Sequence, residues 1–193
     1  MGRENPAPTN PMTEFDPKIH HHHSIRLKGY DYSEAGAYFV TIVTQGRSAM
    51  FGEVVNGEVR LNRYGEIVAE TWQWLETQYL YVELGASVVM PNHFHGILII
   101  TDDRRGGSRT APTGKRKPLG RLIGAFKTVS TKHINILCNT TGAIVWQRNY
   151  YEHIIRNQHD LEQTWCYIEA NPAQWDTDEE NISKTSYESI QAG

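Results

Sequence analysis

The stretch that most constrains the fold is VVMPNHFHGILII, residues 88–100. Apolar segments of this length, rich in β-branched residues, are typical of buried strands. Proline interrupts β structure, so Pro91 divides the region into two predicted strands, one over residues 82–90 and one over residues 93–100. Because the second strand is apolar along its length, we expect it to be buried and rigid.

His93 and His95 open this second strand. Alternation along a strand places them on one face, about 6–7 Å apart, so both imidazoles can bind one ion. The alternative is a pair of histidines that only form hydrogen bonds. Two histidines are too few for a closed structural zinc site, and they leave positions open for a substrate, as a catalytic metal requires.

The rest of the chain predicts an α+β protein in which a sheet carries helices on one face. Further strands are expected over 37–45 and 150–156, and a hairpin over 51–62 with Asn56-Gly57 as its turn. Helices are expected from Asn62 to about residue 79, over 119–137, and from Asn157 to the residues before Pro172. In the last helix we expect Leu161, Trp165 and Ile168 to form the packing stripe.

The predicted organisation is one folded domain, residues 25–175, between two tails. Residues 1–24 are expected to be a disordered arm, and their histidine run, His20–His23, has no fixed geometry for a metal. Residues 101–118 form a basic loop rich in Gly, Arg, Thr and Pro. Residues 176–193 are expected to be an acidic, flexible tail.

Composition excludes several classes of protein. No apolar run is long enough to cross a bilayer, and no signal peptide is evident, which favours the cytoplasm. The two cysteines, Cys138 and Cys166, indicate neither a disulfide framework nor a thiolate zinc site.

Charge is distributed unevenly along the chain. The net charge is -3, yet residues 104–132 hold nine Lys or Arg residues and no acidic residue. This asymmetry indicates either a surface for an anionic polymer or a solvated loop with scattered charge.

Tyr167 is the best candidate for a nucleophile, since no serine-hydrolase or phosphate-loop motif is present. It lies off the predicted packing stripe, and Asn171 follows four residues later on the same helix face. An amide oxygen suits Mg²⁺ or Mn²⁺, so the pair can supply a nucleophile and a third ligand. The alternative is a boundary tyrosine and a helix-ending asparagine. Other candidates are Tyr150 and Tyr151 as nucleophiles, and Glu152 and His153 as ligands.

Four segments, MPNHFHGIL, GRLIGAFKT, VWQRNYYEHIIR and YIEANP, occur in this order. Together they resemble the REP-associated tyrosine transposases of the HUH endonuclease superfamily, and the resemblance extends over residues 24–175. It implies a ferredoxin-like, RRM-like antiparallel sheet with helices. It also implies a metal-dependent strand transferase, with His93, His95 and Asn171 holding Mg²⁺ or Mn²⁺ and Tyr167 as the nucleophile. In the insertion-sequence relatives of that family, the position of Asn171 is often occupied by the longer glutamine.

The implied substrate is single-stranded DNA that folds into a palindromic hairpin, bound by a monomer or a homodimer. The basic segment would grip its backbone through six residues: Lys115, Arg116, Lys117, Arg121, Lys127 and Lys132. Two other functions stay open: a DNA-hairpin-binding regulator or nicking factor of the same fold, and a metal phosphoesterase in which water attacks.

Overall fold

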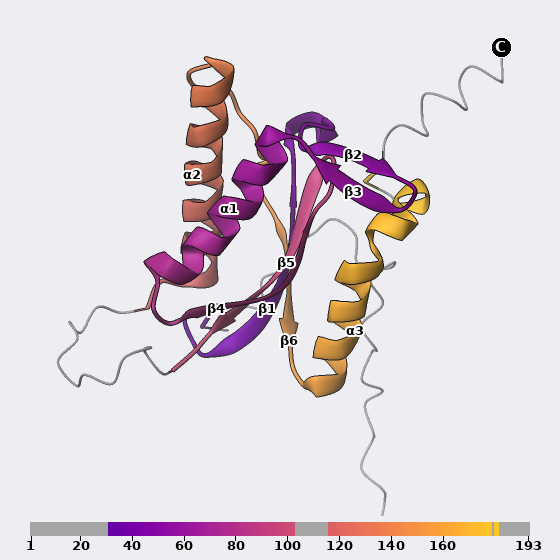
Figure 1. The fold of residues 1–193 in the computed structure, drawn as a ribbon. Helices are drawn as coiled ribbons and strands as arrows, with labels where there is room; N and C mark the ends of the chain where they lie inside the picture. The colour runs from indigo at the N-terminus through magenta and orange to yellow at the C-terminus, as the bar shows by residue number, and fades with distance from the viewer. Residues whose placement is uncertain (1–30, 103–115, 179, 182–193) are drawn as a thin grey trace, which may run out of the picture.

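The computed structural model of the protein describes residues 31–102, 116–178 and 180–181. Its centre is a four-stranded antiparallel sheet in the order β4-β5-β1-β6 (Figure 1). The strands are β1 (Gly36–Val43), β4 (Val82–Val89), β5 (His93–Ile100) and β6 (Tyr151–Ile155). The α+β class with an antiparallel sheet, expected from the sequence, is confirmed.

The connections follow the ferredoxin-like βαββαβ pattern. Helix α1 (Arg63–Gln78) joins β1 to β4, and α2 (Leu119–Cys138) joins β5 to β6. A separate hairpin, β2 (Gly52–Val55) and β3 (Glu58–Leu61), is inserted before α1. Its turn residues Asn56 and Gly57 have φ values of 55° and 78°, as the Asn-Gly pair predicts.

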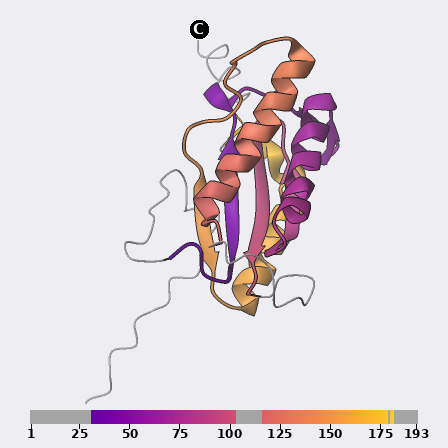
Figure 2. The same ribbon diagram turned by 90° about the vertical axis from the view of Figure 1, so that its left-hand side faces the viewer.

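One face of the sheet is covered by α1 and α2, which pack against each other (Figure 2). Trp72 of α1 lies 4.6 Å from the ring of Phe94 and 5.4 Å from that of Phe126, measured between ring centroids. Asn62 caps α1 by accepting hydrogen bonds from the backbone of Tyr64 and Gly65, as predicted. The contacts of Trp72 with Phe94 and Phe126 form the centre of the main core, between β5 and the helices α1 and α2.

The third helix, α3 (Gln158–Ala170), lies against the opposite face (Figure 1). The expectation of helices on one face therefore holds for α1 and α2 only. The predicted stripe of α3 is wrong at Trp165, which is 40% exposed. Ile168 is buried as predicted, together with Asp160 and Thr164. The Asp160 carboxylate is hydrogen-bonded to His153, and the Thr164 hydroxyl donates to the carbonyl of Asp160.

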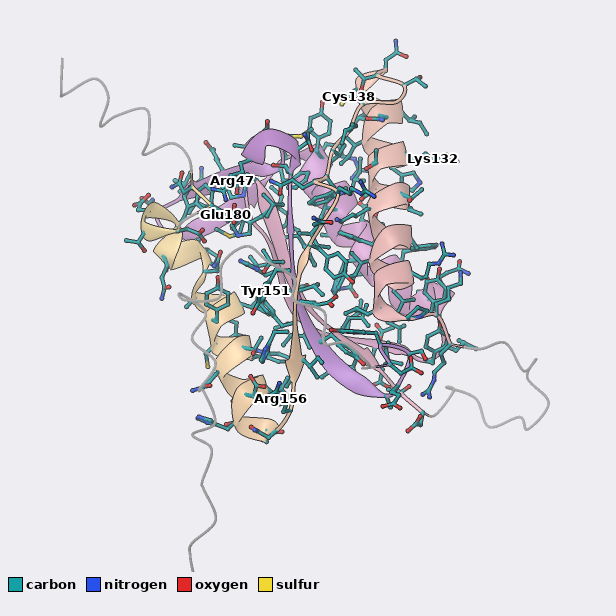
Figure 3. All side chains as sticks on the ribbon, turned by 180° about the vertical axis from the view of Figure 1, so that it is seen from behind. Arg47, Lys132, Cys138, Tyr151, Arg156 and Glu180 are labelled. Atoms are coloured by element: carbon teal, nitrogen blue, oxygen red, sulfur yellow. The ribbon has the colours of Figure 1, made fainter. Side chains whose placement is uncertain are left out.

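The acidic segment predicted to be flexible from residue 176 is ordered over its described part. A 3-10 helix, η2 (Pro172–Thr177), follows α3, and β3 contacts it. Glu180 pairs with Arg47 at 3.1 Å (Figure 3). This packing corrects the prediction: acidic residues that have specific partners do not behave as a solvated tail.

Several sequence predictions lie outside the described residues. These are the arm of residues 1–24, most of the basic loop, and the tail beyond residue 181. Within the described ranges, no helix has the length and apolarity to span a bilayer.

The core beneath β5 predicts opposite effects for two Gly→Ala substitutions. A Cβ on Gly96 would lie 2.7 Å from a ring carbon of Trp72, whereas a Cβ on Gly124 in α2 meets nothing within 4 Å. We expect Gly96→Ala to destabilise the protein by about 1–3 kcal/mol and Gly124→Ala to stabilise it by about 0.5–1 kcal/mol. Urea unfolding measures both, and equal stability of the two variants would contradict the packing described.

Candidate metal centre and active site

The first residues of β5 place two imidazoles side by side on the α3 face of the sheet. His93 and His95 are 0% and 3% exposed, and their ring centroids are 4.5 Å apart. The ring of His95 stacks on Phe39 of β1 at 5.5 Å. Strand alternation thus produces the expected same-face pair, and Phe94 between them points into the main core.

Each imidazole is held through its Nδ1 atom. The Nδ1 of His93 is 2.9 Å from Oδ1 of Asn92, and the Nδ1 of His95 is 2.9 Å from the Thr41 hydroxyl. Hydrogen bonds of this kind fix ring orientation and are common behind metal-binding histidines. The Nε2 atoms are then the available ligand atoms.

Asp178 completes a group of three potential ligands. Its Oδ2 is 3.9 Å from Nε2 of His93, and one ligand atom from each of His93, His95 and Asp178 lies within 4.8 Å of the others. Ligand atoms around an ion at bonds of about 2.0–2.2 Å are separated by roughly 3–4 Å, so small shifts bring the three onto one ion.

The polar atoms at this site fit a metal better than they fit a closed protein interior. The buried Nε2 of His93 and Oδ1 of Asn171 have no hydrogen bond of good geometry among the described residues. Asn171 is 2% exposed, and its Nδ2 is 3.4 Å from Oδ2 of Asp178. Buried polar atoms are normally bonded, so an ion bound to Nε2 of His93 would supply the partner that this atom lacks.

Burial lowers the pKa of His93 from 6.5 to about 4, although the Asp178 carboxylate and the side chain of Asn171 favour the charged ring. The ring is therefore neutral near pH 7. A neutral imidazole is the form that binds a metal.

Tyr167 of α3 lies beside the histidine pair. Its ring centroid is 5.3 Å from that of His95 and 5.9 Å from that of Phe39. The structure thus brings together Tyr167, Asn171, His93 and His95, the residues singled out in the sequence. Their catalytic and ligand roles stay predictions.

The other candidate residues that lie in β6 have surroundings that favour other roles. Burial and the nearby Asp160 carboxylate raise the pKa of Tyr151 to about 12, so its phenol loses a proton less readily than an ordinary tyrosine. His153 bonds Asp160 at 2.9 Å. Glu152 pairs with Val40 of β1, so it shares the α1–α2 face rather than the face of the histidines.

The predicted DNA-binding residues do not gather at the histidines. Arg121 and Lys132 are exposed on α2, which covers the opposite face of the sheet, and Lys132 is distant from Tyr151 in Figure 3. Lys117 lies over the Tyr79 ring at 5.0 Å, Arg116 pairs with Asp102, and Lys115 is outside the described residues.

Lys127 has an internal role. Its Nζ donates to the carbonyls of Gln147 and Asn149, both at 2.9 Å. Burial lowers its pKa to about 8. This lysine therefore fastens α2 to the segment that precedes β6.

Sequence reasoning missed Asp178, together with Trp175, whose ring is 6.0 Å from that of His93. Asp178 lies in an acidic run, DTDEE, where no spacing distinguishes a ligand from a solvated charge. The one feature of the sequence that could have indicated Asp178 as a ligand is its position seven residues after Asn171.

The depressed pKa of His93 predicts a specific acid sensitivity. The unfolded chain binds this proton near pH 6.5 and the folded protein only near pH 4, so stability present above pH 6.5 is lost as pH falls towards 4. We expect this component, up to roughly 3 kcal/mol, to vanish in His93→Gln and to persist in His133→Gln, which alters an exposed histidine. Urea unfolding of the metal-free proteins between pH 7 and 4 measures it, and parallel pH profiles for wild type and His93→Gln would exclude the assignment.

Comparison with known proteins places the chain among relatives. No family model matches it. Its fold is similar to that of a REP-associated tyrosine transposase bound to a REP hairpin, with 20% identity, a TM-score of 0.47, and coverage of 72% of this chain and 67% of that one. It is also similar to a putative transposase from Deinococcus radiodurans, with 19% identity, a TM-score of 0.42, and coverage of 75% and 95%.

The comparison of sequences is more decisive. An uncharacterized protein of Haemophilus influenzae is 34% identical in an alignment of 176 residues that covers 86% of this chain and 97% of the relative. Identity at this level over nearly the whole of both chains identifies the two as homologues, and this chain belongs to the same family as the Haemophilus influenzae protein.

Proposed function

We propose that the protein is a metal-dependent endonuclease and strand transferase that acts on single-stranded DNA through a tyrosine nucleophile. The observation that carries the proposal is the position of Tyr167, whose ring lies 5.3 Å from that of His95 within one chain. A phenol beside a buried pair of ligating imidazoles has the components of metal-assisted phosphodiester transfer.

His93, His95 and Asp178 would hold the ion, and Asn171 would orient Asp178 through its Nδ2. The sequence favoured Asn171 itself as the third ligand, and the carboxylate is the stronger oxygen donor for a divalent cation. Two imidazoles and one carboxylate suit Mn²⁺ better than Mg²⁺, which prefers oxygen. A bound cation would polarise the scissile phosphate and offset its developing charge.

Tyr167 would carry the covalent step. Its phenolic oxygen attacks phosphorus and loses its proton, the bond to the 3′ oxygen breaks, and a 5′-phosphotyrosine and a free 3′-hydroxyl result. A second 3′-hydroxyl reverses the step and joins a new strand, so no external energy source is needed. Phe39 packs edge-on against the Tyr167 ring and restricts its position.

The proposed substrate is a hairpin formed by a palindromic repeat. Support comes from the sequence segments that resemble REP-associated tyrosine transposases, two of which contain the histidines and Tyr167. Because nucleophile and ligands come from one chain, a monomer holds a complete site. The exposed basic residues of α2 lie on the other face, where they would contact DNA away from the point of cleavage.

Replacement of the nucleophile gives the direct test. With Mn²⁺ and a labelled hairpin oligonucleotide from a palindrome beside the gene, we expect wild type to form a protein–DNA adduct that survives denaturation. Tyr167→Phe should form none, a loss of at least about 10³-fold, and EDTA should abolish the adduct in wild type. Tyr151→Phe is the matched control and should retain it.

Two other outcomes would replace the proposal. Cleavage that persists without an adduct in Tyr167→Phe would indicate a phosphoesterase that uses water. Binding of the hairpin without cleavage by wild type would indicate a regulator.

The assignment of Asp178 is tested by binding of Mn²⁺ alone. Asp178→Asn should weaken Mn²⁺ binding by about 10–100-fold, since it removes a charged ligand. Asp176→Asn alters an exposed carboxylate two residues earlier and should leave affinity unchanged. Calorimetric titration measures both, and equal affinities would return the third position to Asn171.

A further inference from the structure

Asn92 is a buried polar residue with several hydrogen-bonding contacts. It is 1% exposed and precedes the first histidine of β5. Its backbone carbonyl accepts a hydrogen bond from the backbone of Thr44 at 2.9 Å. Its side chain makes three further contacts: one with the adjacent His93 and two with the distant Arg47 and Glu180.

Two of these contacts fix which way the amide points. The Nδ2 group lies 3.2 Å from the carbonyl oxygen of Arg47 and 2.5 Å from that of Glu180. Carbonyl oxygens only accept hydrogen bonds, so the atom facing them must be the NH₂ group. The Oδ1 atom is therefore the one that faces His93.

An amide oxygen has no proton to give, so the Nδ1 of His93, 2.9 Å away, must donate. A neutral imidazole has one proton, which leaves Nε2 of His93 with its lone pair directed towards His95 and Asp178. The Thr41 hydroxyl behind His95 imposes no such choice, because a hydroxyl both donates and accepts.

We propose that Asn92 is a positioning residue that locks His93 in the Nδ1-protonated form and ties the segment carrying Asp178 to the same ligand. The attachment of the Asp178 segment follows from the hydrogen bond that Asn92 donates to the carbonyl of Glu180, two residues after Asp178. Arg47 reinforces this link, since its guanidinium pairs with the Glu180 carboxylate at 3.1 Å. The two residues are labelled close together in Figure 3. One buried amide thus orients one proposed ligand and anchors the chain beside another.

This inference rests on the proposed function for its relevance to catalysis, but its test does not require DNA. Long-range ¹H–¹⁵N NMR of the metal-free protein reports which ring nitrogen of His93 carries the proton, with the His93→Gln variant used for assignment. We expect the Nδ1-protonated form in wild type. In Asn92→Ala we expect a mixture of both forms and Mn²⁺ binding weakened by about 10–100-fold.

Asn92→Asp separates the two roles and serves if the alanine variant does not fold. Its carboxylate still accepts from Nδ1 of His93, but it cannot donate to the carbonyls of Arg47 and Glu180. The Nδ1-protonated form should therefore persist, whereas amide hydrogens near Asp178 and Asn181 should exchange faster than in wild type. Thr41→Val is the matched control and should leave the protonated nitrogen of His93 unchanged.

Three results would overturn the proposal: an Nε2-protonated His93 in wild type, an unchanged His93 with unchanged Mn²⁺ affinity in folded Asn92→Ala, or unchanged amide exchange in Asn92→Asp. Failure of wild type to bind Mn²⁺ or to form a DNA adduct would contradict the proposed function instead, since the NMR and exchange measurements on the metal-free protein stand apart from both.

Discussion

The pairing of β1 with β5 is the interaction on which the rest of the site depends. Its register sets Thr41 opposite His95 and Val43 opposite His93, while the other edge of β1 sets Thr41 opposite Tyr151. A slip of one residue would turn both imidazoles into the main core, because side chains alternate between faces. The aromatic packing of Trp72, Phe94 and Phe126 on the other face makes such a slip costly.

The same register gives the two faces of the sheet different compositions. The α1–α2 face is an aromatic and aliphatic core that holds the strands in place. The α3 face carries a smaller cluster, with Phe39, Ile97 and Ile168 packed beside the polar group of histidines, asparagine and aspartate. The sheet thus presents the proposed ligands His93 and His95 on one side of the site, and α3 presents the proposed nucleophile, Tyr167, on the other.

Local patterns predicted most of the elements, since strand alternation, the Asn-Gly turn and the asparagine caps act within a few residues. They also singled out His93, His95, Tyr167 and Asn171 as candidates, which the structure brings together and whose roles stay predictions. The burial of α3 could not be predicted in the same way. Asp160 and Thr164 are buried through bonds to His153 and to the helix backbone, and helical spacing alone favoured Trp165. Asp178 was missed because the histidines beside it are distant in sequence, and the position of Asn92 because its contacts with Arg47 and Glu180 are.

That distance has a consequence for folding. The potential ligands come from the start of β5 and from beyond α3, and they meet only when the sheet has closed and the C-terminal segment has docked. An unfolded chain therefore offers an ion no preformed site, and a bound ion acts as a ligand of the native state alone. Binding of an ion would therefore raise the free energy of local opening around η2, the segment that leads into Asp178.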